Sequence, residues 1–197
     1  MHSRHAEHAI LLSGTIVADE TFIGGNSKNK HRQGKYGKQG GAGSHKRSMA
    51  NKTTVLSLID KATGEVRSKV IPDVTGATLA KELAAQVDMA NSDLQTDGGS
   101  QYRAIGQEFI SHEFVDHSAY EYVRGDVTTN AVEGFFSQLK RSLDGTHHHV
   151  SRKHLHRYLA EFDYRYSSRE DTDTERMTNL MRYRVGGRRL SYRPVVD

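Results

Sequence analysis

The chain has 197 residues, of which 35% are hydrophobic and 26% are charged, and it contains no cysteine. A chain of this length suits one domain with an appendage, or at most two small domains, and the lack of thiols excludes disulfides and cysteine-based zinc sites. No apolar run approaches the roughly 20 residues that a transmembrane helix needs. The composition therefore indicates a globular protein, which we expect in the cytoplasm.

The positive charge is concentrated in one stretch of the chain. The formal net charge is only +4, yet residues 24–52 contain eight Lys and Arg side chains and no acidic one. A second run of arginines occupies 182–193. Local basic blocks in a nearly neutral chain indicate a polyanionic partner such as nucleic acid. A solvated loop or tail is the alternative interpretation of either block taken alone.

The first third of the chain predicts three strands. In residues 14–25 apolar and polar side chains alternate, and many of them are β-forming, which predicts a strand that carries Asp19. Residues 26–52 are rich in glycine and nearly devoid of apolar side chains, which predicts a loop or a long hairpin tip. Residues 53–71 then predict a strand, a turn at 60–64 and another strand.

The middle of the chain predicts alternating helices and strands. Leucines at helical spacing predict a helix over 75–91. A short strand over 92–97 follows and is ended by two glycines. A short helix over 102–109 and a strand over 111–118 complete this part.

Helices dominate the last third. Residues 128–143 predict a helix with one buried face, whose apolar stripe consists of Val132, Phe135, Phe136, Leu139 and Leu143. A second long helix over 151–169 and a third over 174–185 follow. We interpret three tyrosines of the second helix as core residues rather than base-stacking residues: Tyr158, Tyr164 and Tyr166.

Glu133 and Lys140 lie at the border of the apolar stripe of the first of these helices. They are seven residues apart, which is about two helical turns, so both point the same way. One explanation is a capping box in which Asn130 is the N-cap and Glu133 is the third helical residue. The other is that an acid and a base are needed together at the rim of the buried face.

The order of the elements predicts a mixed sheet covered by helices. Asp19 lies within the first strand, and Asp97 lies at the carboxyl end of the fourth, where ligands of open α/β sheets collect. Glu133 begins the helix after the fifth strand, and these three acids form the candidate site. Glu20 adjoins Asp19 but faces the opposite side of the strand, so we expect it to have a supporting or structural role.

The spacing of the acids and their local sequences resemble a known family. Thirty-five residues separate Asp97 from Glu133, and Lys140 follows seven residues later. Together with the strings "ADETFIGG", "TDGGSQY" and "NAVEGFFSQLKRSLDG", this pattern is similar to the ISXO-like insertion-sequence transposases, which belong with the DDE transposases and retroviral-type integrases. The resemblance covers about 14–169. It implies an α/β, RNase H-like fold in which a mixed five-stranded sheet is flanked by helices, with extra C-terminal helices.

The resemblance also implies a chemistry. Such transposases cleave DNA and transfer a strand by in-line displacement at phosphorus, using two Mg²⁺ (or Mn²⁺) ions held by carboxylates. In this chain Asp19 would bind both ions, Asp97 one and Glu133 the other. The implied partners are transposon ends and target DNA, with a homodimer in the synaptic complex and a place on the bacterial nucleoid.

The basic residues are expected to contact DNA. Lys140 would meet a phosphate beside Glu133, and the basic loop would clamp the DNA backbone without reading its sequence. The expected DNA-binding side chains are Lys28, Lys30, Arg32, Lys35, Lys38, Lys46, Arg47, Lys52, Lys140, His148 and Arg165. We do not interpret the three histidines at 147–149 as a zinc site, because consecutive side chains rarely converge on one ion.

The expected organisation is a lead-in over 1–13, a catalytic domain over 14–169 and a helical, basic tail over 170–197. Similar transposases usually carry a zinc ribbon before the first catalytic strand, so we expect this cysteine-free chain alone to bind DNA weakly and without sequence preference. Two alternative functions stay open: an RNase H-like nuclease that cuts without joining, and a non-enzymatic, DNA-binding remnant of a transposase. Ser167 favours the remnant, because the family pattern has Asn there.

Overall fold

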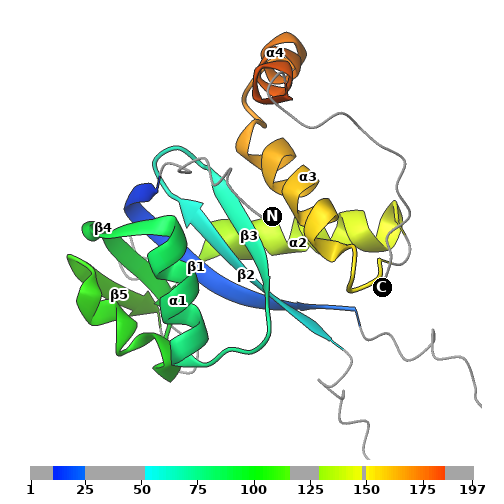
Figure 1. Cartoon of the computed structure of the whole chain (residues 1–197). Helices are drawn as coiled ribbons and strands as arrows, with labels where there is room; N and C mark the ends of the chain where they lie inside the picture. Colours follow the sequence, from blue (N-terminus) through cyan, green and yellow to red (C-terminus); the bar gives the residue numbers. More distant parts are fainter. Residues whose placement is uncertain (1–10, 25–51, 116–128, 148–149, 185–197) are drawn as a thin grey trace, which may run out of the picture.

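The computed structural model describes residues 11–24, 52–115, 129–147 and 150–184. Most of the predicted basic loop lies outside the described residues. In the described part, the chain forms an α/β structure with one five-stranded mixed sheet and helices on both of its faces (Figure 1). The predicted RNase H-like fold class is therefore confirmed.

The sheet has the strand order β3-β2-β1-β4-β5. β1 pairs antiparallel with β2, and β2 pairs antiparallel with β3, whereas β4 is parallel to both β1 and β5. The strands are β1 (Leu12–Ile23), β2 (Thr53–Asp60), β3 (Val66–Ile71), β4 (Val87–Asp97) and β5 (Ser111–Val115). The chain leaves the edge strand β3, crosses over through α1 and returns as β4, which pairs in parallel with the central strand β1.

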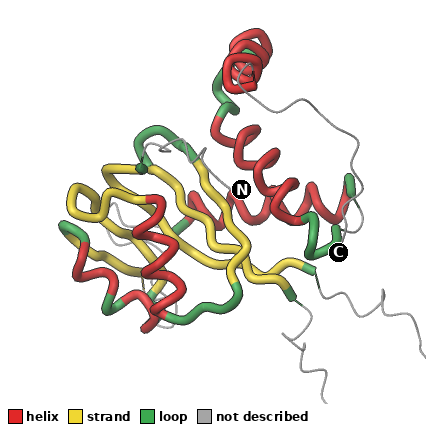
Figure 2. The backbone as a smooth tube through the Cα atoms, viewed as in Figure 1, coloured by secondary structure: helices red, strands yellow, loops and turns green. Residues whose placement is uncertain are grey.

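Helices cover the two faces of the sheet separately. α1 packs on one face, and α2 and α3 pack on the other, which divides the core into two apolar clusters. The helices are α1 (Gly76–Gln86), α2 (Asn130–Gly145), α3 (Leu155–Ser167) and α4 (Asp173–Arg184), and two short 3₁₀ turns, Ser100–Tyr102 and Ile105–Glu108, lie between β4 and β5. Figure 2 shows α4 beyond the end of α3, away from the sheet. Of the helices described, none combines the length and apolar character that a membrane crossing requires.

Alternation along β1 assigns each side chain to one of the two cores. Ile16 and Ala18 join the cluster beneath α1, whereas Val17 joins the cluster beneath α2 and α3. Because successive strand residues face opposite sides, Asp19 follows Val17 onto the α2 face, and Glu20 follows Ala18 onto the α1 face. The two neighbouring acids are thereby placed in different environments.

The predicted helix over 75–91 is too long, and this prediction is corrected by the structure. α1 ends at Gln86, and Val87 is already the first residue of β4. Val87 pairs with Leu12 of β1, and the register of the ladder shifts after this pair. Pairing with a strand distant in sequence therefore ends the helix, although the local apolar spacing favoured its continuation.

The turn between β2 and β3 forms where the sequence predicted it. Asp60 Oδ1 accepts hydrogen bonds from the backbone N–H groups of Ala62 (2.9 Å) and Thr63 (3.4 Å). Gly64 has a φ of +73°. This left-handed conformation is unstrained for glycine but strained for residues with a side chain. The local sequence is sufficient to specify this turn.

Side chains of α3 cover the edge strand β3. Asp163 Oδ2 accepts a hydrogen bond from Ser68 N–H at 2.6 Å, and its Oδ1 accepts one from Ser68 Oγ at 2.7 Å. One helical turn later, Ser167 Oγ accepts a hydrogen bond from Val66 N–H at 2.9 Å. Unpaired N–H groups on an edge strand can pair with other chains. These contacts therefore hold α3 against β3 and give the edge-strand N–H groups of Val66 and Ser68 an acceptor. Ser167 therefore has a structural role in this chain.

We expect Asp163→Ala to lower the free energy of unfolding by roughly 1–3 kcal/mol, because the N–H of Ser68 would lose its acceptor and the hydroxyl of Ser68 would keep only Ser57 Oγ as a partner. Urea denaturation of the full chain measures this change. Asp144→Ala removes an exposed acid from α2 and is the matched control, for which we expect a change below about 0.5 kcal/mol.

The same variant has an expected pH dependence. Burial raises the pKa of Asp163 to about 6, although the hydrogen bonds from Ser68 act in the opposite direction. Because the folded-state pKa lies above the ordinary value, the stabilising contribution of this carboxyl is complete below about pH 4 and is lost as the pH rises through 6. The destabilisation caused by Asp163→Ala should therefore be larger at pH 5 than at pH 8. An equal loss at both pH values would contradict this account.

Candidate active site

Asp19 lies half-buried in the second half of β1, on the face that α2 covers. Its Oδ1 accepts a hydrogen bond from Glu20 N–H at 2.7 Å. Burial raises the pKa of Asp19 to about 7, this hydrogen bond lowers it, and the charges of Asp97, Glu20 and Glu133 raise it again. The two predicted partner acids therefore lie within electrostatic range of Asp19.

Asp97 is the last residue of β4, the strand that runs parallel to β1. The last pair of the β1–β4 ladder joins Val17 to Gln95, and Asp19 and Asp97 each follow two residues later on the same face of the sheet. The backbone N–H of Gly99 donates to Asp97 Oδ1 at 3.2 Å, which orients the carboxylate. The two aspartates therefore project from neighbouring strands at one end of the sheet.

Glu133 comes from the first turn of α2, where the positive end of a helix favours a carboxylate. The predicted apolar stripe of this helix is buried as expected, so the helix lies on the Asp19 face. The capping box that was one of the two explanations for Glu133 does not form at Asn130, because Thr129 is the N-cap. Thr129 O accepts the first helical hydrogen bond from Glu133 N–H, which starts the helix one residue earlier and removes the basis for a capping box at Asn130.

The three acids do not form a closed cluster of metal ligands. Within the described ranges, no three His, Asp or Glu side chains are arranged to hold an ion. Asp19 and Asp97 are half-buried, whereas Glu133 is exposed, and its Oε1 accepts a hydrogen bond from Thr129 Oγ1 at 2.8 Å. The site as it stands is thus an aspartate pair with a glutamate at its margin.

Glu20 faces the other side of the sheet, as strand alternation predicted. Tyr102 O–H donates to Glu20 Oε1 at 2.5 Å, and the tyrosine is fully buried in the cluster beneath α1. Burial raises the pKa of Glu20 to about 7, the hydrogen bond from Tyr102 lowers it, and the charge of Asp97 raises it. Burial also raises the pKa of Tyr102 well above its ordinary value, so the phenol remains a donor.

Sequence reasoning missed two residues that contact the candidate acids. Tyr102 was predicted only as the start of a short helix, and Thr129 was passed over in favour of its neighbour as the cap. For Tyr102 the available signal was its position five residues after Asp97, in the same string that carries the family resemblance. For Thr129 the signal was weak, since Thr and Asn are both common N-caps.

Three of the predicted DNA-binding residues fall in the described ranges. Lys140 is exposed on α2, and Lys52 is half-buried just before β2. Arg165 is exposed on α3 but forms an ion pair with Glu161 at 3.5 Å. The others lie outside the described residues: Lys28, Lys30, Arg32, Lys35, Lys38, Lys46, Arg47 and His148.

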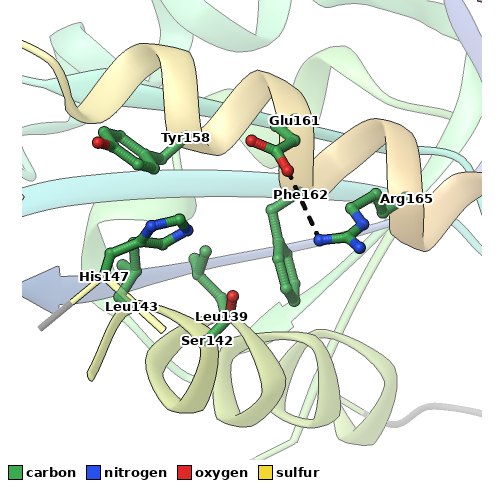
Figure 3. A pocket seen from close by; sticks show the side chains of 8 residues that line it. All are labelled: Leu139, Ser142, Leu143, His147, Tyr158, Glu161, Phe162 and Arg165. Atoms are coloured by element: carbon green, nitrogen blue, oxygen red, sulfur yellow. Dashed lines mark ion pairs between the residues drawn. The ribbon is translucent and has the colours of Figure 1, made fainter. Parts of the chain in front are cut away.

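A small cavity between α2 and α3 has none of the three acids in its lining. Figure 3 shows His147 and Tyr158 close together at one side of it, with ring centroids 4.6 Å apart, and Phe162 extending toward α2. The cavity has room for about one water molecule, so it is a packing feature. Tyr158 and Tyr166 pack against the apolar cluster beneath these helices, which supports their interpretation as core residues.

Comparisons with known proteins agree with the geometry. A family model described as an ISXO2-like transposase domain matches residues 11–167. An uncharacterized protein in the transposable element ISH50 of Halobacterium salinarum (strain ATCC 700922 / JCM 11081 / NRC-1) is 28% identical over 159 residues, which cover 78% of this chain and 52% of that protein. The chain therefore spans about half the length of that relative.

We expect Asp19→Asn to raise the thermal midpoint at pH 8 in the presence of EDTA. The change removes a buried negative charge that neighbouring acids repel, and it keeps an oxygen to accept the Glu20 N–H. Because the folded-state pKa of Asp19 is raised to about 7, this carboxyl loses its stabilising contribution as the pH rises through 7. The gain should therefore be absent at pH 5, and differential scanning calorimetry at both pH values measures it.

Asp144→Asn is the control for this change, because Asp144 is exposed on the same chain. We expect no shift for it at either pH. A fall in the midpoint of Asp19→Asn at pH 8 would mean that the carboxylate stabilises the fold and that the repulsion among the acids is unimportant.

Proposed function

The chain belongs to the ISXO2-like transposase domain family, and we propose that it cleaves DNA and transfers strands during transposition in a metal-dependent reaction. The proposed substrates are transposon ends and target DNA. A homodimer would hold two ends in one synaptic complex. Since the chain spans about half of its relative, these activities are proposed for the domain and not taken from that protein.

The observation that carries this proposal is the effect of Asp97 and Glu133 on Asp19. Their charges, and that of Glu20, raise the pKa of a carboxyl that burial already raises. Acids separated by many residues are thus held where they repel one another, which costs stability unless a cation lies among them. Perturbed acids of this kind concentrate at functional sites.

The donor set fits hard divalent cations such as Mg²⁺ or Mn²⁺, which prefer carboxylate oxygen and water. Gln95 supports this fit, because its Oε1 is buried on the Asp97 face and accepts no hydrogen bond from the described part of the chain. A buried acceptor is normally hydrogen-bonded. A water molecule bound to a cation at this site would supply the missing donor. Asp19, Asp97 and Glu133 would hold the two ions, and Glu133 would exchange its bond from Thr129 for this role.

The ions would activate the attacking oxygen and stabilise the leaving oxygen of an in-line displacement at phosphorus. The protein's own contribution is positioning. β1 and β4 hold two carboxylates on rigid strands, and α2 carries the third on a helix whose apolar face is anchored in the core. Lys140 lies two helical turns beyond Glu133 and would bind a phosphate of the DNA that enters the site.

A non-enzymatic remnant of a transposase is the second candidate, and one observation favours it. Glu133 is exposed and hydrogen-bonded to Thr129 instead of completing a ligand cluster. Catalytic groups often reach their final geometry only with ligand bound, and for this reason catalysis is the first proposal. Ser167 no longer favours the remnant, because it bonds the edge strand β3.

The decisive experiment is strand joining. A labelled, pre-cleaved duplex with a free 3′-OH, taken from the DNA that flanks this chain's own gene, is incubated with supercoiled plasmid. We expect joined product with Mg²⁺ or Mn²⁺ and none with EDTA. We expect Asp97→Asn to reduce joining on the order of 10²-fold or more, because it removes a group that stabilises the charge of the transition state.

Asp144→Asn makes the same chemical change away from the acids and should join at the wild-type rate. Metal-dependent nicking without joining would assign the chain to the nuclease class. Neither nicking nor joining, with metal binding unchanged in Asp97→Asn, would favour the remnant.

We expect Lys140→Ala to weaken binding of duplex DNA and to reduce the slope of log affinity against log salt by about 0.9, the value for one phosphate contact. Fluorescence anisotropy across a salt series measures both. Lys81→Ala is the matched control, since Lys81 is an exposed lysine on α1, on the opposite face of the sheet. Equal effects of the two substitutions would show that only overall charge matters.

A further inference from the structure

The β1–β4 ladder ends before it reaches the candidate acids. Its last pair is Val17 with Gln95, so no described backbone pairing between these strands joins Asp19 to Asp97. Asp19 stays paired with Ser57 of β2, and Asp97 with Val115 of β5, but beyond Val17 and Gln95 no pair of the β1–β4 ladder limits variation in the separation of the two acids. A two-metal site tolerates little of this, because its ions lie only about 3.5–4 Å apart.

A side-chain hydrogen bond crosses this gap on the opposite face of the sheet. After Asp97 the chain turns, with Gly99 N–H bonded to Asp97 Oδ1, and enters the 3₁₀ turn that contains Tyr102. Tyr102 O–H then donates to Glu20 Oε1 at 2.5 Å. The two residues are 82 positions apart in sequence, so this contact joins the two segments directly.

Each end of this hydrogen bond is connected to a candidate acid. At one end, Glu20 N–H donates to Asp19 Oδ1 at 2.7 Å. At the other, Tyr102 closes a six-residue segment whose first residue is Asp97. The route from one carboxylate to the other thus consists of three hydrogen bonds, of 2.7, 2.5 and 3.2 Å, and the backbone between them.

The setting of Tyr102 makes the contact rigid. Its side chain has no solvent exposure and is packed in the apolar cluster with Leu79 and Leu83 of α1. A hydrogen bond to a carboxylate is strengthened where water is excluded, and a ring held on all sides cannot follow the carboxylate if it moves. Glu20 must therefore stay where the phenol holds it.

We infer that Tyr102 and Glu20 are positioning residues which set the separation of Asp19 and Asp97 for metal binding. This inference rests on the proposed function, because it requires the two aspartates to bind divalent cations. It assigns neither Tyr102 nor Glu20 to the ions themselves. It also explains why the α1 face, which lacks the three candidate acids, contains a buried polar pair at this end of the sheet.

The test is a titration of the full chain with Mn²⁺ alone. Electron paramagnetic resonance measures the concentration of free Mn²⁺, and thus the amount bound. We expect Tyr102→Phe, which removes one hydroxyl, to raise the half-saturating Mn²⁺ concentration by roughly tenfold, as loss of a supporting hydrogen bond does in other metal sites. Tyr164→Phe is the matched control. Its hydroxyl donates to Arg176 O between α3 and α4, so the substitution should leave Mn²⁺ binding unchanged.

Glu20→Gln separates positioning from ligation. Its amide oxygen can still accept the bond from Tyr102, so its Mn²⁺ binding should be closer to wild type than that of Tyr102→Phe. Weaker binding by Glu20→Gln than by Tyr102→Phe would make Glu20 a ligand and overturn the inference. Unchanged binding by a folded Tyr102→Phe variant would overturn it as well.

Asp97→Asn distinguishes failure of this inference from failure of the proposed function. If Asp97→Asn binds Mn²⁺ as wild type does, the proposed function fails and the inference falls with it. If Asp97→Asn loses binding while Tyr102→Phe does not, only the inference fails. Should Tyr102→Phe not fold, the double variant Glu20→Met with Tyr102→Phe removes both polar partners together, and the same rise in half-saturating Mn²⁺ is expected from it.

Discussion

The parallel pairing of β1 with β4 is the constraint on which the rest of this structure depends. It places a strand from the start of the chain beside one that follows the first helix, and both lie between two apolar layers. Asp19 and Asp97 each lie two residues beyond the last pair of this parallel ladder, so they come from neighbouring strands at the carboxyl end of β4. The register that aligns Val17 with Gln95 also decides that both aspartates face α2. A shift of one residue would turn either acid to the opposite face.

The acids at this edge act against the stability of the fold. Asp19 and Glu20 are both buried enough to raise their pKa values to about 7, and each is repelled by Asp97. Proteins retain such groups where function requires them. The surrounding structure offsets the cost with contacts that involve no candidate acid. The apolar stripe of α2 is one, and the hydrogen bonds from β3 to Asp163 and Ser167 are another.

α2 couples the core to the surface. Five of its side chains are buried at helical spacing, and this anchoring fixes where the residues at the border of the stripe lie. Glu133 at the start of the helix and Lys140 near its middle therefore share one side, with the glutamate within electrostatic range of Asp19. The proposed function would use both of them, the acid at the metal ions and the base at a phosphate of the DNA. The hydrogen bond from Thr129 Oγ1 to Glu133 Oε1 links the N-cap residue of α2 to a candidate acid.

The sequence by itself determined the strand-rich first third, the β2–β3 turn, the apolar face of α2 and the identity of the candidate acids. These features depend on neighbours within a few residues, or on local strings typical of a family. It did not determine the end of α1, since Val87 leaves the helix to pair with Leu12, a residue 75 positions earlier. It also did not determine the N-cap of α2, because Thr129 and Asn130 are chemically similar caps. Only the tertiary structure decided that Tyr102 reaches Glu20, because an alternating pattern shows which face a residue takes but not which distant side chain it meets there.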